Sequence, residues 1–167
     1  YKDKIDAIFS DESSANLSKT DTEMLLSTMY VFYAKKVYDG IDSKKVKEMG
    51  VTTSLDMSLP DASSESGKVD WEKILKQLLP YVDIYIPSIE ETMFMISRDD
   101  FDELNRNAKG HDILENLDLE KLPELGEKLI SYGAKIAVIK CGIKGYYIRT
   151  QGSEILKSMG KAKPADI

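Results

Sequence analysis

Cysteine and histidine are almost absent from this chain of 167 residues, which holds one of each, Cys141 and His111. A single cysteine cannot form an internal disulfide, and the two residues together are too few for a Cys/His zinc site. One histidine, without a G-x-S-x-G sequence, also gives no basis for serine-hydrolase chemistry. A single unpaired thiol fits a reducing compartment, so we expect a cytoplasmic location.

Other absences exclude further classes of protein. No run of about 18 apolar residues occurs, so we predict no membrane-spanning segment and no membrane partner. The 29 acidic residues outnumber the 23 basic ones and give a formal net charge of −6. Because binding to a phosphate backbone requires a concentrated basic face, we expect no nucleic-acid partner. The glycine-rich P-loop and dinucleotide-binding sequences are missing as well.

The chain has enough apolar residues, 42% of the total, to form a core, and we expect residues 1–167 to be a single domain. Short runs rich in β-branched and aromatic residues alternate with segments in which apolar residues recur every three to five positions. The first kind of pattern predicts strands and the second predicts helices. The predicted strands are residues 29–33, 51–55, 82–86, 135–139 and 146–149, and the predicted helices are residues 34–49, 70–79, 88–96 and 123–132.

This alternation is typical of an α/β fold with a mostly parallel sheet and helices on both faces. Local signals mark the helix ends: Gly50 and Gly133 suit helix C-termini, Asp70 suits an N-cap and Pro123 suits a first helical turn. Residues 98–118 are polar, and we expect them to be a mostly exposed insert with a short helix near residues 101–104.

Three side chains fall at or just after the ends of predicted parallel strands, namely Asp56, Ser88 and Lys140. Ligands of such sheets bind beyond the carboxyl ends of the strands, so these residues are the first candidates for a site. Asp56 could orient a hydroxylated ligand or hold a metal. The structural alternative is that it ends its strand and caps a turn.

Ser88 and Glu91 have the S-x-x-E spacing of a capping box, in which each side chain accepts a hydrogen bond from the other residue's N–H. A helix that starts at the rim of a parallel sheet also presents free N–H groups to an anion. Glu91 could further hold Mg²⁺ through water. The structural and the functional interpretation are compatible here.

Two glycines lie in the turn formed by Lys140, Cys141, Gly142, Ile143, Lys144 and Gly145. One interpretation is a hairpin whose glycines adopt positive φ. The other is a backbone surface that lies close to a nucleotide or its phosphates, with Lys140 as counter-charge. Both stay open. Cys141 itself suits a structural thiol better than a nucleophile, because no histidine is near it in the sequence.

Several segments also match sequence patterns in the order and spacing of one enzyme family. Residues 50–56 match a strand that ends in Asp, residues 82–91 match V-D-[hydrophobic]-P-N-x-x-E, and residues 133–145 match a strand followed by G-x-x-G. Residues 16–21 are similar to its A-N-x-x-L-[T/S]-x-x-D stretch. The chain thereby resembles the middle portion of the PfkB (ribokinase-like) carbohydrate kinases, which transfer the γ-phosphoryl group of ATP to a sugar hydroxyl.

The resemblance implies a ribokinase-like fold, ATP and Mg²⁺ as cofactors, and a sugar or related small hydroxylated compound as substrate. It assigns the nucleotide-binding turn to residues 140–145 and the Mg²⁺ and phosphate arrangement to Glu91. Ser88 takes the place of the family's asparagine near the triphosphate, although its side chain is shorter and has no amide. Asp56 would lie near the substrate.

Two family motifs do not occur in the chain: the glycine-rich sugar-binding segment with G-G-N and the G-A-G-D motif that carries the base. We therefore expect a fragment, incomplete at both ends and inactive alone, of a kinase that forms homodimers in its full-length state. The alternative is a non-catalytic flavodoxin- or receiver-like α/β binding module, with Asp56 and Lys140 as phospho-acceptor and lysine. A purely structural or assembly domain is the third possibility.

Overall fold

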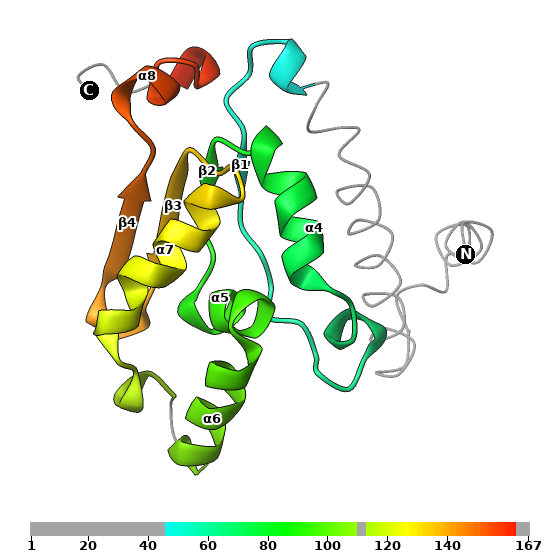
Figure 1. Ribbon diagram of the computed structural model, residues 1–167, viewed down its shortest axis with the longest axis vertical. Coiled ribbons are helices and arrows are strands. Elements are labelled where there is room, and N and C mark those ends of the chain that lie inside the picture. Colours follow the sequence, from blue (N-terminus) through cyan, green and yellow to red (C-terminus); the bar gives the residue numbers. More distant parts are fainter. Residues whose placement is uncertain (1–45, 110–112, 163–167) are drawn as a thin grey trace, which may run out of the picture.

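The computed structural model describes residues 46–109 and 113–162, which form an open four-stranded sheet with helices (Figure 1). The strand order is β1-β2-β3-β4. The strands β1, β2 and β3 are parallel and β4 is antiparallel to β3. Their bounds are β1 Ser54–Leu55, β2 Ile84–Tyr85, β3 Ile136–Lys140 and β4 Tyr146–Thr150.

The prediction of an α/β fold with a mostly parallel sheet is thus confirmed. Helical layers on both faces and a ribokinase-like topology go beyond this result and stay predictions. The predicted strand at 29–33, most of the helix at 34–49, the motif at 16–21 and His111 lie outside the described residues.

The helices follow the predicted order, and α7 lies across β3 and β4 in Figure 1. None of the helices in the described ranges combines the length and the apolar character needed to cross a bilayer. The α-helices are α4 Trp71–Leu78, α5 Ile89–Ile96, α6 Arg98–Ala108, α7 Leu122–Ser131 and α8 Ser153–Leu156, and short 3-10 helices occur at Glu65–Gly67, Leu79–Tyr81, Ile113–Asn116, Leu119–Lys121, Gly142–Lys144 and Gly160–Ala162.

The helix ends agree with their local signals. Asp70 is the N-cap of α4 and accepts a hydrogen bond from the Lys73 N–H at 2.9 Å. Pro123 lies in the first turn of α7. The N–H groups of a first turn have no partner within the helix, so the absence of one from proline costs no hydrogen bond there. Gly133 follows the end of α7 with a φ of 117°, close to the backbone of Pro80.

The helix α6 extends beyond the short helix predicted near residues 101–104. Its residues are mostly exposed or half-buried, but Phe101 and Ala108 are buried, and the ring of Phe101 meets that of Phe94 edge-on with the ring centroids 5.4 Å apart. Polar residues outnumber the apolar ones in α6. The sequence pattern therefore did not indicate the helical spacing of Phe101, Leu104 and Ala108.

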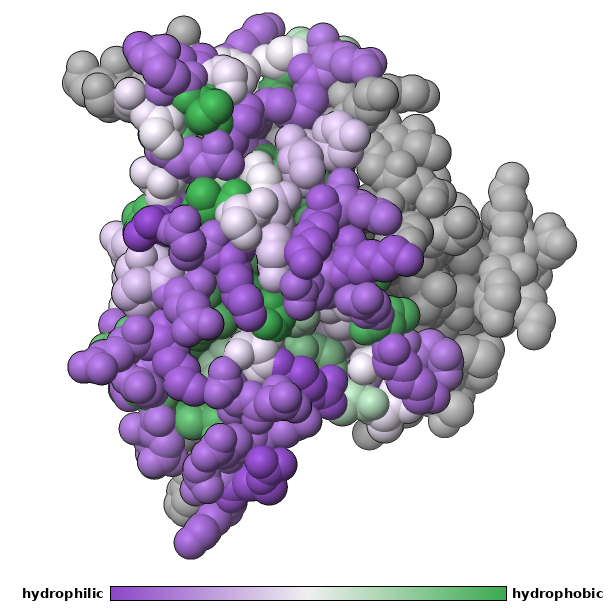
Figure 2. All heavy atoms as spheres, viewed as in Figure 1, coloured by the Kyte–Doolittle hydropathy of each residue, from purple (hydrophilic) through white to green (hydrophobic). Residues whose placement is uncertain are grey.

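The main core lies between the helices and one face of the sheet. Tyr85, Ala137 and Ile139 on that face are buried, whereas Ile84 and Ile136 on the other face are half-buried. The face of the molecule with α4 and α7 is mostly hydrophilic, and its apolar residues are visible in small separate areas (Figure 2). The described helices therefore turn charged side chains outward and apolar ones toward the sheet.

A buried carboxylate lies at the amino-terminal edge of the parallel strands. Asp83, just before β2, is fully buried and lies 2.7 Å from the Lys47 Nζ and 2.8 Å from the Lys135 Nζ. The Thr53 N–H also donates to it at 2.9 Å. Burial by itself raises the pKa of Asp83, but the hydrogen bonds from Lys135, Lys47 and Thr53 outweigh it and the pKa is lowered.

The segment after β4 returns to this same edge. The Thr52 hydroxyl donates to the Met159 carbonyl and accepts from the Ala162 N–H, over separations of 107 and 110 residues. A Cβ on Gly160 would lie 2.7 Å from the carbonyl oxygen of Gly50, so only glycine permits this close approach. Residues 159–162 are thus joined to the chain that leads into β1.

Candidate functional site

An ion pair joins the carboxyl ends of two strands that are not neighbours. Lys140 is the last residue of β3, and Asp56 follows the end of β1, with β2 between them. The Lys140 Nζ lies 2.7 Å from both carboxylate oxygens of Asp56. The side chains are 41% and 58% exposed, so a ligand in solution can reach both charges.

Ser88 lies beside this ion pair. It forms an isolated parallel bridge with Lys140, whose N–H donates to the Pro87 carbonyl at 2.9 Å. The structure therefore brings Asp56, Ser88 and Lys140 to one edge of the sheet, as expected from their places at the strand ends. Their roles in binding stay predictions.

Glu91 closes the capping box at the start of α5. The Ser88 N–H donates to the Glu91 Oε2 at 2.6 Å, and the Glu91 N–H donates to the Ser88 Oγ at 3.2 Å. The capping interpretation is confirmed. Its two hydrogen bonds compensate in part for the burial of this residue, which is 8% exposed.

The pKa of Glu91 is nevertheless raised above its usual value. Burial is the largest cause, the charge of Asp56 adds to it, and the Ser88 hydrogen bonds and the charge of Lys140 oppose it. The carboxylates of Glu91 and Asp56 thus belong to one electrostatic cluster with a single ammonium group, that of Lys140. We call these three residues, together with Ser88, the strand-end cluster.

The turn after β3 is a glycine-dependent hairpin. Gly142 and Gly145 have φ values of 55° and 90°, and the Cys141 N–H donates to the Gly145 carbonyl at 2.8 Å. The hairpin interpretation is confirmed by the antiparallel pairing of β3 and β4. No neighbouring atom lies within 4 Å of a Cβ built on Gly145, and Ile143 is 99% exposed, so the outer surface of the turn is open.

Cys141 lies inside this turn and is 1% exposed. Burial is the largest cause that raises the pKa of its thiol, and the charge of Glu90 adds to it. The thiol contacts the Ile139 carbonyl at 3.6 Å. A buried thiol that resists ionisation is a structural residue and a poor nucleophile, as the sequence predicted.

The strand-end cluster offers few ligands to a metal ion. Within residues 46–109 and 113–162, no group of three or more His, Cys, Asp or Glu side chains could hold one. Mg²⁺ commonly keeps several waters and binds through one or two carboxylates plus the phosphates of its ligand. Asp56 and Glu91 supply two carboxylates at most, so they do not form a dedicated metal cage.

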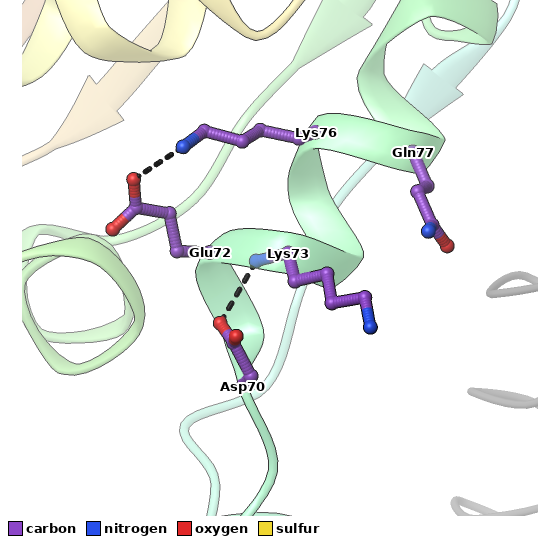
Figure 3. A pocket seen from close by; sticks show the side chains of 5 residues that line it. All are labelled: Asp70, Glu72, Lys73, Lys76 and Gln77. Atoms are coloured by element: carbon purple, nitrogen blue, oxygen red, sulfur yellow. Dashed lines mark hydrogen bonds and ion pairs between the residues drawn. The ribbon is translucent and has the colours of Figure 1, made fainter.

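A shallow pocket of about 390 Å³ lies on another surface and carries no comparable arrangement (Figure 3). The residues that line it belong to α4 or its N-cap. Two of them form an ion pair within the helix, since Lys76 lies 2.7 Å from Glu72, and Asp70 caps the helix. No residue of the strand-end cluster lines it. The lining residues are Asp70, Glu72, Lys73, Lys76 and Gln77.

The direct contact between Asp56 and Lys140 was not predicted, although both residues were candidates. The signal was present as two opposite charges at the ends of parallel strands, but their contact depends on the strand order, which the sequence does not give. No protein-family model matches the chain, and no curated protein matches it.

Proposed function

We propose that the chain is part of an ATP- and Mg²⁺-dependent kinase that phosphorylates a hydroxyl of a sugar or a related small compound. The observation that carries this proposal is the strand-end cluster beside an open glycine turn, at the carboxyl edge of a mostly parallel sheet. This edge is where such sheets bind their ligands. The resemblance to the PfkB carbohydrate kinases names the ligand class.

In this proposal the turn at residues 140–145 supports the nucleotide. Its open outer surface lets a ligand approach the backbone closely at Gly145, and Lys140 supplies the positive charge that a phosphate chain needs. Ile143, which is almost fully exposed, offers an apolar contact next to that surface. Ser88 lies beside Lys140 and extends the polar surface toward the start of α5.

Glu91 and Asp56 are the residues that would hold Mg²⁺, through water or directly. The ion, when bound, neutralises phosphate charge during phosphoryl transfer. Glu91 is already engaged with the Ser88 N–H and Asp56 with Lys140. We therefore assign binding and positioning to these residues and no proton transfer.

Titration calorimetry of the folded chain with ATP and Mg²⁺ tests the binding step. We expect the wild type to bind and Lys140→Met to bind at least about tenfold more weakly, since a charge-assisted contact is worth 1.5–3 kcal/mol. Lys121→Met is the matched control, because Lys121 is 44% exposed and also paired with a carboxylate, that of Asp100. No binding of ATP at millimolar concentration, by this chain and by the full-length protein, would overturn the proposal.

Turnover is tested on the full-length protein. ADP formation should depend on one member of a panel of sugars and nucleosides and should fall in Lys140→Met. If the full-length protein binds ATP but forms no ADP with any acceptor, it is a nucleotide-binding module and the proposed kinase activity is wrong.

One observation favours a second candidate, a receiver-like phospho-acceptor module. A phospho-acceptor site of this kind pairs an aspartate at one strand end with a lysine at another, and Asp56 and Lys140 form such a pair. Incubation with acetyl phosphate and Mg²⁺ distinguishes the two: a phosphoryl group on Asp56, absent in Asp56→Asn, would support the receiver.

A further inference from the structure

We propose that β4 is an interaction surface, which pairs in antiparallel orientation with β4 of a second copy of this chain. The two sheets join edge to edge around a two-fold axis at Ile148. This inference does not depend on the proposed function, because it concerns the outer edge of β4 and not the strand-end cluster.

The first step is the direction of the backbone groups of β4. The strand is at one end of the sheet, and no other strand of the described residues pairs with its outer edge (Figure 1). The Cys141 N–H donates to the Gly145 carbonyl, and the Gln151 N–H donates to the Lys135 carbonyl. Residue pairs that exchange such hydrogen bonds alternate with pairs that do not. The even-numbered residues of β4 therefore direct their N–H and C=O groups away from β3.

The second step is the exposure of the same residues. Arg149 pairs with Glu127 of α7, and the half-buried Tyr147 packs against the core, so the odd-numbered side chains lie on the helix face of the sheet. Side chains alternate between the two faces along a strand, which places Tyr146 and Ile148 on the opposite face. There they are 70% and 50% exposed. The outer edge thus combines outward-directed backbone groups with an apolar surface.

The third step is the register. When Ile148 lies opposite Ile148 of the second copy, Tyr146 lies opposite Thr150, and all five residues of β4 are paired. Each outward N–H and C=O group then faces a partner, and the two-fold axis makes every contact twice. Any other two-fold register leaves residues of β4 outside the strand pairing. A shift toward Thr150 also sets the two copies of Arg149 opposite each other.

The side chains that meet in this register suit each other, which is why we assign a second copy as the occupant. Arg149 lies opposite Tyr147 of the second copy, a pair of a guanidinium group and an aromatic ring. Its charge is also balanced by Glu127. Ile148 lies beside Val138 of β3 and gains a second apolar neighbour at the axis. No like charges face each other across the paired strands.

Sedimentation equilibrium of the chain over a range of concentrations tests this pairing. Two paired strands of five residues bury a small area, and interfaces below about 1,200 Å² are typical of weak association. We therefore expect a reversible equilibrium of monomer and dimer with a dissociation constant on the order of 100 μM. A wild-type chain that stays monomeric up to about 1 mM would overturn the proposal.

The variant Ile148→Lys places two ammonium groups opposite each other at the axis. The dissociation constant should rise by at least about tenfold, since like charges in direct opposition disfavour association. Ile155→Lys is the matched control, because Ile155 is 44% exposed and lies in α8, away from β4. It should leave the dissociation constant unchanged. A thermal unfolding curve for each variant verifies that it is folded.

A mixture of two variants tests the register itself. Ile148→Glu alone should weaken the dimer as Ile148→Lys does, whereas an equimolar mixture of the two should associate again, because opposite charges then meet at the axis. If the mixed variants stay monomeric, Ile148 does not face its own copy and the proposal is wrong. The proposal is also wrong if the wild type forms a dimer that Ile148→Lys leaves intact, since another surface then carries the association.

Discussion

The Lys135 Nζ lies 2.8 Å from the buried carboxylate of Asp83, at the edge of the sheet opposite to the exposed pair of Lys140 and Asp56. Lysine and aspartate thus form pairs of different kinds at the two edges of the sheet. At the amino edge, the Asp83 side chain is fully buried and its two lysine partners are 19% and 13% exposed, which suits a structural role. At the carboxyl edge, both charges are accessible, which suits binding.

Asp83→Asn should destabilise the protein by about 3 kcal/mol, because it removes the negative charge that two lysines share in a buried site. Urea unfolding at neutral pH measures the loss. Asp102→Asn is the control, since Asp102 pairs with Arg98 on the exposed surface of α6, and its effect should stay within about 0.5 kcal/mol. A loss below about 1 kcal/mol in Asp83→Asn would contradict the structural role.

The pKa of Asp83 is lowered in the folded protein, so its stabilising contribution is present above its usual value of 3.8 and is lost as pH falls through the folded value. The stability difference between the wild type and Asp83→Asn should therefore shrink in acid. Unfolding curves recorded from neutral pH to about pH 3 test this trend, and a difference that does not change with pH would contradict it.

Glu91 should have the opposite pH dependence. Its pKa is raised from 4.5, so its contribution is fully present below that value and is lost as pH rises through the folded pKa. Glu91→Gln keeps an acceptor for the Ser88 N–H but does not ionise. Its stability relative to the wild type should therefore increase between about pH 4 and pH 7. A relative stability that falls over this interval would show that the charge of Glu91 is stabilising.

Gly133→Ala should destabilise the protein by about 2 kcal/mol or more. The φ of 117° is unfavourable for alanine, and the added Cβ would lie 2.8 Å from the Cα of Pro80. Gly50→Ala is the matched control, because Gly50 also has a positive φ, of 69°, but no atom within 4 Å of its Cβ position. Equal losses in the two variants, measured by thermal or urea unfolding, would show that the contact with Pro80 is unimportant.

The helix ends could be predicted because their signals are local. Asp70, the Ser88–Glu91 pair and Pro123 each act on the helix that they begin, within three residues. The hairpin at residues 140–145 was likewise predictable from its glycines. Such features depend on neighbouring residues in the chain and not on the rest of the fold.

The contacts that build the candidate site could not be derived in this way. Asp56 and Lys140 are 84 residues apart, and their meeting depends on β2 lying between β1 and β3. The strands β1 and β2 are also shorter than their apolar runs, with two ladder residues each. The extent of α6 was missed because few of its residues are apolar, although Phe101 joins the main core.

The contact between Thr52 and residues 159–162 closes a loop of more than 100 residues. The entropy lost in closing a loop grows with its length, and contacts between distant residues slow folding. The hydrogen bonds of Thr52 with Met159 and Ala162 therefore carry a larger closure entropy than the pairing of β3 with β4, which joins residues close together in the chain. Shortening the chain between them, as in a circular permutant that starts after β1, should lower that entropic cost.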